Sequence, residues 1–311
     1  MSNTHSYQSG KFYWTFLLPQ YWKIWIAIIF LMLLALLPWS IQHRLASFLG
    51  GIAFKGLKSR RQTTVRNLEV CFPEWTPEQV QHNAQHVFID MMLGVFETLN
   101  AWYSPQWFKN RISIQGLEHL KQAQDAGQGV LLLGTHSTLL DAGGYLCSKY
   151  FEPDVVYRPQ NSPLLDMLVF RCRATIYRHQ IDHDDMRGLI KHLRHGRAIW
   201  YSPDQDFGLK QGVMAPFFGT PAATVTAHRR LLKISNAVAI PLYFYRTGDI
   251  KNPQYHLLIE PILDNFPSDN ELQDAIRVNK IIEQQLRIAP TQYMWFHRRF
   301  KTRPDGYDQI Y

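Results

Sequence analysis

The part of the chain that follows Gly129 alternates short apolar runs with longer amphipathic segments. The runs "VLLL", "DVVY", "TIY" and "AIWYS" are separated by segments such as "STLLDAGGYLCSKY", "SPLLDMLVFRCR" and "DDMRGLIKHLRHG". Strands that alternate with helices are typical of α/β proteins with a largely parallel sheet. We therefore predict an α/β fold with a mostly parallel central sheet flanked by helices. Only "RTGDIKNPQ" joins the last two runs, "AVAIPLYFY" and "YHLLIEPIL", so we expect these two strands to pair antiparallel.

Two capping patterns predict where helices begin outside this alternation. In "TPEQ", Thr76 is a suitable N-cap, with proline at the first helical position and Gln79 three residues on. Ser268 with Glu271 predicts a second such start, for a helix that runs to about residue 288. We find no internal repeat and no long linker, and therefore predict that residues 47–311 form one domain.

The stretch Ile24–Ile41, "IWIAIIFLMLLALLPWSI", carries no charge. It is borderline for a membrane span, which needs about 20 residues, and Pro38 interrupts it. Pro38 and Trp39 follow the apolar core where a secretory signal would have small residues for cleavage. We predict an N-terminal membrane-anchoring helix within residues 1–46, which is not removed. A buried core helix is the alternative.

The distribution of charge around this stretch predicts the orientation of the chain. Only Lys11 and Lys23 precede the stretch, whereas six basic residues follow it: Arg44, Lys55, Lys58, Arg60, Arg61 and Arg66. Because cytoplasmic flanks are rich in Lys and Arg, we expect a single anchor with the main domain facing the cytoplasm. The net charge of +8 favours an anionic partner, whether nucleic acid, anionic lipid or an acidic carrier protein.

His136 follows the run "VLLL", and Asp141 lies five residues further on. If a strand ends near Thr135 and a helix begins before Asp141, the carboxylate can orient the imidazole, which then acts as a general base. Ligand sites in open α/β sheets also lie at the carboxyl ends of strands. The alternative is a helix-capping aspartate beside a half-buried histidine, and the spacing alone leaves both possibilities open.

Asp204 and Asp206 of "SPDQDFG" follow another apolar run, so we expect them at the same edge of the sheet as His136. They are candidates to order the active-site loop or to pair with arginines, and turn formation is the alternative. No glycine-rich loop or His-Arg-Asp accompanies the Asp-Phe-Gly triplet, which excludes a kinase.

Histidines 179, 183, 192 and 195 have helical ligand spacing but lie on basic segments, so we predict no metal.

The C-terminal "QYMWFHRRFKTRP" interleaves aromatic residues with Arg298, Arg299 and further cations. Such a pattern can bind single-stranded nucleic acid, but no recognised nucleic-acid-binding motif is present. Beside a membrane anchor, aromatic and basic residues fit lipid headgroups better. We predict membrane lipids and no nucleic acid as partners.

Five blocks, "HSTLLD", "YRPQNSPLLD", "PDQDFG", "APFFGTPA" and "PTQYMWFHRRFK", occur in this order across residues 136–303. Together they resemble the lipid A biosynthesis acyltransferase family, the late lauroyl- and myristoyltransferases of Gram-negative bacteria. That family belongs to the lysophospholipid acyltransferase group, which is marked by His-x4-Asp/Glu. The resemblance implies transfer of an acyl chain from acyl carrier protein to a hydroxyl of a lipid A precursor at the bacterial inner membrane. It also implies no metal, no cofactor and no covalent acyl-enzyme.

On this resemblance we expect His136 to be the base, Asp141 its orienting partner and Arg173 the support for developing charge. The further substrate-binding candidates are Arg158, Arg171, Asp204, Asp206, Arg298 and Arg299, with exposed surface charge as the alternative for the arginines. Two other functions remain open. A glycerolipid acyltransferase uses the same dyad, but its Phe-Pro-Glu-Gly-type block is absent, since the only "FPE" lies upstream of His136. The other is a non-catalytic membrane protein that binds anionic lipid.

Overall fold

The computed structural model describes residues 7–304 and 306–311 and contains a central sheet of seven strands in the order β1-β9-β8-β2-β5-β3-β4. The strands are β1 (Ile112–Gln115), β2 (Val130–Leu133), β3 (Pro153–Tyr157), β4 (Gln180–Asp182), β5 (Ala198–Tyr201), β8 (Val238–Thr247) and β9 (Gln254–Ile259). Five neighbouring strands, from β8 to β4, are parallel. This confirms the predicted α/β fold with a mostly parallel sheet.

The antiparallel part of the sheet lies at its other edge. Strands β8 and β9 pair antiparallel, with Leu242 opposite Ile259, as the short connection between them predicted. Strand β1 then pairs parallel to β9. Strands β6 (Gly212–Phe217) and β7 (Thr220–Val225) form a separate antiparallel hairpin.

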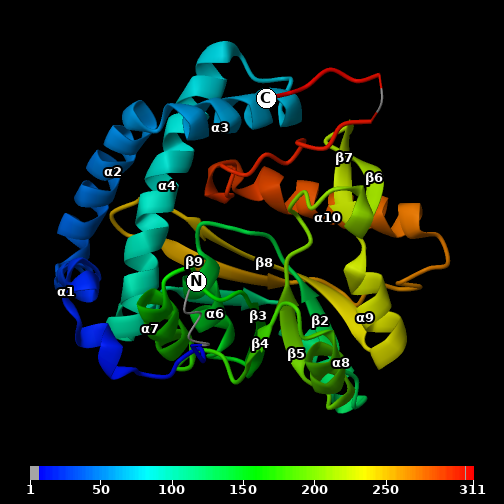
Figure 1. Cartoon of the computed structure of the whole chain (residues 1–311). Coiled ribbons are helices and arrows are strands. Elements are labelled where there is room, and N and C mark those ends of the chain that lie inside the picture. The colour runs from blue at the N-terminus through cyan, green and yellow to red at the C-terminus, as the bar shows by residue number, and fades with distance from the viewer. Residues whose placement is uncertain (1–6, 305) are drawn as a thin grey trace, which may run out of the picture.

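Both faces of the sheet are covered by helices, which explains why β2 is an unbroken apolar run (Figure 1). Val130 and Leu132 pack in one hydrophobic cluster with α5 (Leu117–Asp125) and α6 (Leu140–Cys147). Leu131 and Leu133 pack in another, on the opposite face, with α8 (Met186–Arg194), α9 (Ala227–Ser235) and α10 (Glu271–Ile288). A strand buried on both faces has no polar alternation.

The first part of the chain folds into four helices: α1 (Trp22–Ala35), α2 (Trp39–Gly56), α3 (Lys58–Cys71) and α4 (Pro77–Tyr103). In Figure 1, α1, α2 and α4 lie at the left and α3 runs across the top. The predicted capping box at Thr76 is confirmed, because its hydroxyl accepts from the Gln79 N–H and the Gln79 side chain accepts from the Thr76 N–H. Helix α2 packs along α4. The remaining helix, α7, spans Pro163–Arg173, and short 3-10 helices occupy Trp14–Leu17, Pro19–Tyr21, Pro105–Phe108, Leu209–Gln211 and Pro290–Gln292.

The apolar stretch expected to form one membrane-anchoring helix is divided in two. Helix α1 ends at Ala35, and Pro38 is the N-cap of α2, because proline has no N–H to continue the α1 ladder. With 14 residues, α1 is about 21 Å long, against about 30 Å for the hydrocarbon core. Within residues 7–304 and 306–311, no helix combines the length and the apolar character that a membrane crossing requires. Helix α2 also continues through the expected domain boundary at residues 46 and 47.

Two smaller predictions differ from the structure. The N-cap of α10 is Asn270, whose side chain accepts from the Gln273 N–H, whereas Ser268 lies outside the helix and bonds with the Asn270 backbone instead. The run "TIY" at residues 175–177 is not a strand but follows the end of α7, and its apolar side chains Ile176 and Tyr177 are buried. The strand in this region is β4, three residues later.

Candidate active site

His136 lies just beyond the carboxyl end of β2 and is bonded to Asp204, which follows β5. Its Nδ1 is 2.6 Å from Asp204 Oδ1, and its backbone N–H donates to Asp204 Oδ2 at 2.9 Å. The two residues are 68 positions apart, but β2 and β5 are parallel neighbours with Leu133 opposite Tyr201. Both chain segments therefore leave the sheet at the same edge, where ligand sites of open α/β sheets lie.

The Asp204 side chain is fully buried, whereas a quarter of the His136 side chain is exposed. Burial alone would raise the pKa of Asp204, but the charge and hydrogen bonds of His136 lower it to about 2. Burial alone would lower the pKa of His136, and the Asp204 carboxylate more than compensates, so that this pKa is raised. A carboxylate at Nδ1 accepts the Nδ1–H and leaves Nε2 with a lone pair. Nε2 is therefore available as a proton acceptor.

The C-terminal segment that contains "QYMWFHRRFK" packs against His136 and Asp204. The Met294 N–H donates to the His136 carbonyl at 3.0 Å, and the Tyr293 hydroxyl donates to the Asp204 carbonyl at 3.4 Å. The ring of His297 lies 6.1 Å from that of His136, centroid to centroid, and its Nε2 is 3.0 Å from Gln205 Nε2. Burial and the neighbouring His136 lower the pKa of His297. His297 was not among the predicted site residues, although Arg298 and Arg299 follow it in the same aromatic and basic motif.

On another side, the ring of Trp200 lies 6.2 Å from the ring of His136. In the described part of the chain, four buried side-chain groups near the ends of β2 and β5 have no hydrogen-bond partner: Thr135 Oγ1, Thr138 Oγ1, Trp200 Nε1 and Ser202 Oγ. Buried polar groups usually have partners, so these are candidate donors for a bound substrate. Helix α4 reaches the same loop, because a Cβ on Gly94 would lie 2.0 Å from the Thr138 carbonyl oxygen.

Asp141 forms an ion pair with Arg173 rather than the expected contact with His136. Arg173 Nε and Nη2 donate to the two oxygens of Asp141 at 2.7 and 3.0 Å. The pair joins the first turn of α6 to the last turn of α7, and both side chains are largely buried, at 10% and 15% exposed. Burial would lower the pKa of Arg173, but the Asp141 charge raises it. The strand does end before His136 and α6 does begin at Leu140, yet a different carboxylate reaches the imidazole.

The other predicted site residues occupy varied positions. Arg158 is exposed just after β3, and Arg171 is exposed with its Nε bonded to the Gly10 carbonyl at 2.9 Å. Asp206 accepts from the Thr302 N–H and hydroxyl at 2.7 and 2.8 Å, and so ties its loop to the C-terminal segment. Arg298 is exposed and lies 5.7 Å from the centre of the Tyr311 ring.

Arg299 differs from the expectation of a substrate-binding surface residue, because it is 1% exposed. Its guanidinium donates to the Ala223 carbonyl, the Thr224 hydroxyl and the Asn279 side chain at 2.6, 3.1 and 3.2 Å. These bonds fasten the β6–β7 hairpin and α10 to the C-terminal segment. The enclosed guanidinium therefore supports the fold around the site and offers no surface to a substrate in this conformation.

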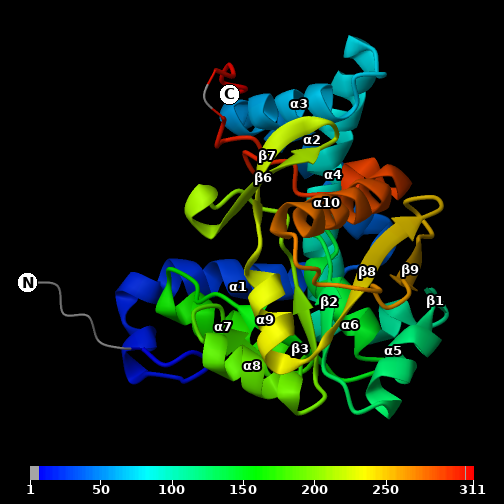
Figure 2. The same cartoon turned by 90° about the vertical axis from the view of Figure 1, so that its right-hand side faces the viewer.

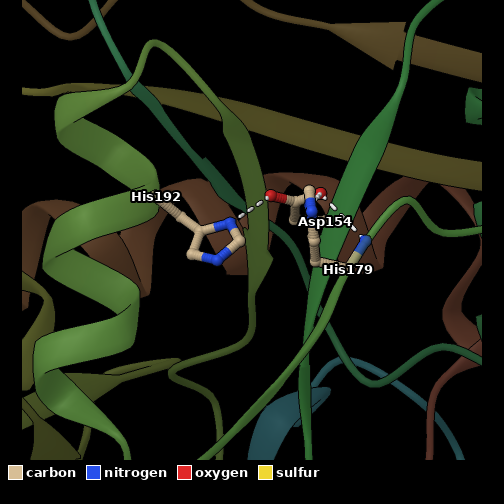
Figure 3. Close-up of side chains that lie close together, drawn as sticks. All are labelled: Asp154, His179 and His192. Carbon is tan, nitrogen blue, oxygen red and sulfur yellow. Dashed lines mark hydrogen bonds and ion pairs between the residues drawn. The ribbon is translucent and has the colours of Figure 1, made fainter.

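Asp154, His179 and His192 form a cluster with the spacing of a metal site at the start of β3 (Figure 3). The Nδ1 atoms of both histidines lie 3.0 Å from the buried carboxylate. Arg197 occupies the same carboxylate, with Nε and Nη2 at 3.1 and 2.7 Å from its two oxygens. A cation that bound beside this guanidinium would meet like-charge repulsion, and one that displaced it would break the Asp154–Arg197 ion pair. The cluster has a structural role, because its hydrogen bonds join Asp154 of β3 to α8 and to Arg197, which precedes β5.

The comparisons with known proteins agree with the blocks found in the sequence. Residues 9–302 match the model of the bacterial lipid A biosynthesis acyltransferase family. The chain is 36% identical to the lipid A biosynthesis lauroyltransferase of Escherichia coli K12 over 307 residues, which cover 97% of this chain and 98% of that protein.

Two further relatives extend this similarity. A lipid A biosynthesis acyltransferase of Haemophilus influenzae is 35% identical, over 93% of this chain and 94% of its own length. The lipid A biosynthesis myristoyltransferase of Escherichia coli K12 is 27% identical, over 94% and 91%. The resemblance seen in the ordered motifs is thereby confirmed. The chain is an acyltransferase and belongs to the bacterial lipid A biosynthesis acyltransferase family.

Proposed function

We propose that this protein transfers a fatty acyl chain from acyl carrier protein to a hydroxyl of a lipid A precursor, with His136 as the general base and Asp204 as its orienting carboxylate. The observation that carries the proposal is the 2.6 Å contact between His136 Nδ1 and Asp204 Oδ1, which directs Nε2 away from the carboxylate. The family supports acylation of lipid A, and its relatives are named for lauroyl, palmitoleoyl and myristoyl transfer.

In the proposed reaction, Nε2 of His136 accepts the proton of the acceptor hydroxyl as its oxygen attacks the thioester carbonyl. The new C–O bond forms, the C–S bond breaks, and the imidazolium returns the proton to the departing sulfur. Asp204 stabilises the imidazolium between these steps, because its buried charge lies against Nδ1. No acyl-enzyme is required, since the hydroxyl itself is the nucleophile.

The developing oxyanion needs donors. Arg173 is the candidate with a full charge: its bonds to Asp141 use Nε and Nη2 and leave Nη1 outside the ion pair. Asp141 would then position Arg173 rather than His136. The unpartnered Trp200 Nε1 and Ser202 Oγ are neutral candidates for the same role, and Arg158 is an exposed cation at the same edge of the sheet.

We further propose that α1 and α2 bind the bacterial inner membrane and hold the catalytic domain at its cytoplasmic face. Both helices carry large apolar side chains that are exposed: Trp22, Ile26, Ile29, Phe30, Leu33, Phe48 and Ile52 among them. Exposed apolar patches of this extent are typical of membrane or protein contact sites. Basic residues of α3 follow directly and fit anionic headgroups.

The test is mass spectrometry of a lipid A precursor incubated with the purified protein and acyl carrier proteins loaded with lauroyl, palmitoleoyl or myristoyl chains. We expect one added acyl mass with at least one donor, and a loss of about 10²- to 10⁴-fold in rate for His136→Ala. The general-base mechanism is wrong if His136→Ala retains the full rate. The proposed donor is wrong if the wild type transfers none of these chains.

A further inference from the structure

A groove between α8 and α9 lies outside the site described above. It has a volume of about 440 Å³ and is lined by Arg187, Ile190, Lys191, Arg194, His195 and Ile234. The other residues from α8 and its C-cap lie three, four, seven and eight positions after Arg187, which places them on one face of the helix. The groove is therefore formed by the packing of α8 against α9.

The side chains that line the groove are basic or apolar. Arg187, Lys191, Arg194 and His195 are all exposed, and none of the residues that line the groove is acidic. The apolar surface comes from Ile190 and from Ile234, which is 40% exposed, together with the aliphatic stems of the basic side chains. An apolar strip with a cationic rim fits an amphipathic partner that brings acidic side chains and a few apolar ones.

The position of the groove favours a soluble partner over a membrane. In Figure 1, α1 and α2 form the left flank of the molecule, whereas α8 and α9 lie at the lower right. Figure 2, in which the right-hand side faces the viewer, shows α8 and α9 in front. A bilayer that contacts the exposed apolar side chains of α1 and α2 would thus lie against the opposite side of the protein.

The groove is also oriented toward the active site. Helix α8 begins after β4 and leads into β5, and both strands are parallel to β2. Its first turn, with Arg187, therefore lies at the carboxyl edge of the sheet, where His136 and Asp204 are found. Arg194 and His195 lie toward the other edge. A helix docked along α8 would have one end at the level of the catalytic residues.

We propose that this groove is the docking site for the protein part of the acyl donor, an acidic helix of the carrier protein. The proposal rests on the proposed function, in which a carrier protein supplies the thioester. The acidic side chains meet Arg187, Lys191 and Arg194, and apolar side chains of the helix contact Ile190 and Ile234. The groove binds only the carrier protein, whereas the thioester reacts at His136.

The test compares two donors with the same acyl chain: lauroyl-acyl carrier protein and lauroyl-pantetheine, which lacks the acidic protein. For Arg187→Gln/Lys191→Gln in the full chain, we expect KM for the carrier-protein donor to rise about tenfold and to depend less on salt. KM and kcat for lauroyl-pantetheine should stay at wild-type values, which also shows that the variant is folded. Lys109→Gln/Lys121→Gln removes two exposed charges elsewhere and is the matched control.

Each outcome decides a separate question. Equal KM values of wild type and double variant for the carrier-protein donor would overturn the docking site. If the wild type transferred the lauroyl chain from neither donor, the proposed function would be overturned instead. An equal rise in KM for the control variant would show a general charge effect and would also overturn the docking site. Weakened vesicle binding of the double variant, with unchanged KM for the carrier protein, would favour a membrane contact and reject the proposal.

Discussion

His136 and Asp204 come from two separate strands of the parallel sheet, and their side chains meet at 2.6 Å between Nδ1 and Oδ1 at its carboxyl edge. The carboxylate is fully buried and also accepts the backbone N–H of His136. His136 is thus held through its ring and through its backbone, which limits rotation of the imidazole and directs Nε2 away from Asp204.

This relationship predicts different effects for two aspartate substitutions. Asp204→Asn removes the charge that stabilises the imidazolium, and we expect kcat to fall on the order of 100-fold. Asp141→Asn leaves the His136–Asp204 pair intact and acts through Arg173. Acyl-transfer rates of the two purified variants check this. A full loss in Asp141→Asn with a wild-type rate in Asp204→Asn would show that Asp141 is the orienting residue after all.

The pH dependence of kcat/KM should report the His136–Asp204 pair. The pKa of His136 is raised above its ordinary value of 6.5, and the base works only when it is neutral. Activity should therefore fall on the acid side with an apparent pKa above 6.5. In Asp204→Asn the raising charge is gone and burial lowers the pKa, so the acid limb should move to lower pH. A limb that stays in place would assign it to another group.

The Asp141–Arg173 pair should contribute to stability as well as to the site. Asp141→Leu leaves a largely buried guanidinium without its carboxylate, and we expect a loss of about 2–4 kcal/mol in the free energy of unfolding. The double variant Asp141→Leu/Arg173→Met removes both charges and should recover most of this loss. Chemical unfolding of wild type, single and double variant measures it. If the recovered double variant also regained acyl transfer, Arg173 would have no catalytic role.

A second ion network is connected through Gln292 to the loop that carries His136. Arg246 Nη1 is 2.6 Å from Glu97 Oε1, and Arg246 also binds Asp90, while Gln292 bridges the Arg246 backbone to the Thr138 N–H. Arg246→Met should cost about 3–5 kcal/mol in unfolding free energy, because Glu97 is fully buried without a cation.

Burial already raises the pKa of Glu97, despite the opposing effect of Arg246. Without Arg246 the carboxyl should remain protonated to higher pH, so the loss in the free energy of unfolding should shrink as the pH falls. Unfolding measured across the acid range checks this, with Arg246→Met/Glu97→Gln as the control that should not show the pH trend from Glu97. A pH-independent loss in Arg246→Met would contradict the explanation.

Membrane binding through α1 should depend on its exposed apolar side chains. Ile29 and Leu33 are 55% and 57% exposed, and Ile29→Asp/Leu33→Asp should reduce binding to phosphatidylethanolamine–phosphatidylglycerol vesicles at least about tenfold. Leu272→Asp/Ile288→Asp places the same charges on exposed positions of α10 and should leave binding unchanged. Vesicle co-sedimentation measures both. Equal binding of all three proteins would exclude α1 as the contact.

Much of the fold could be predicted because the relevant signals are local. The run from Val130 to Leu133 is apolar on both faces, and its strand is buried on both faces; Thr76 and Gln79 form a capping box within four residues. The apolar stretch does not form one continuous helix, because Pro38 lacks the N–H that would extend α1 and instead precedes α2 as its N-cap. The start of α10 was misplaced because Ser268 and Asn270 are both good caps.

The candidate site divides in the same way. By itself, the sequence determined the family, through its ordered blocks, and the placement of His136 beyond a buried strand, through the apolar run before it. Only the tertiary structure decided which carboxylate serves His136, because Asp204 is 68 residues distant and is brought near by the in-register pairing of β2 with β5. It also decided that Arg299 is enclosed and that His297 faces the site, since the packing of the C-terminal segment on α3, α10 and the hairpin sets which side of that segment is buried.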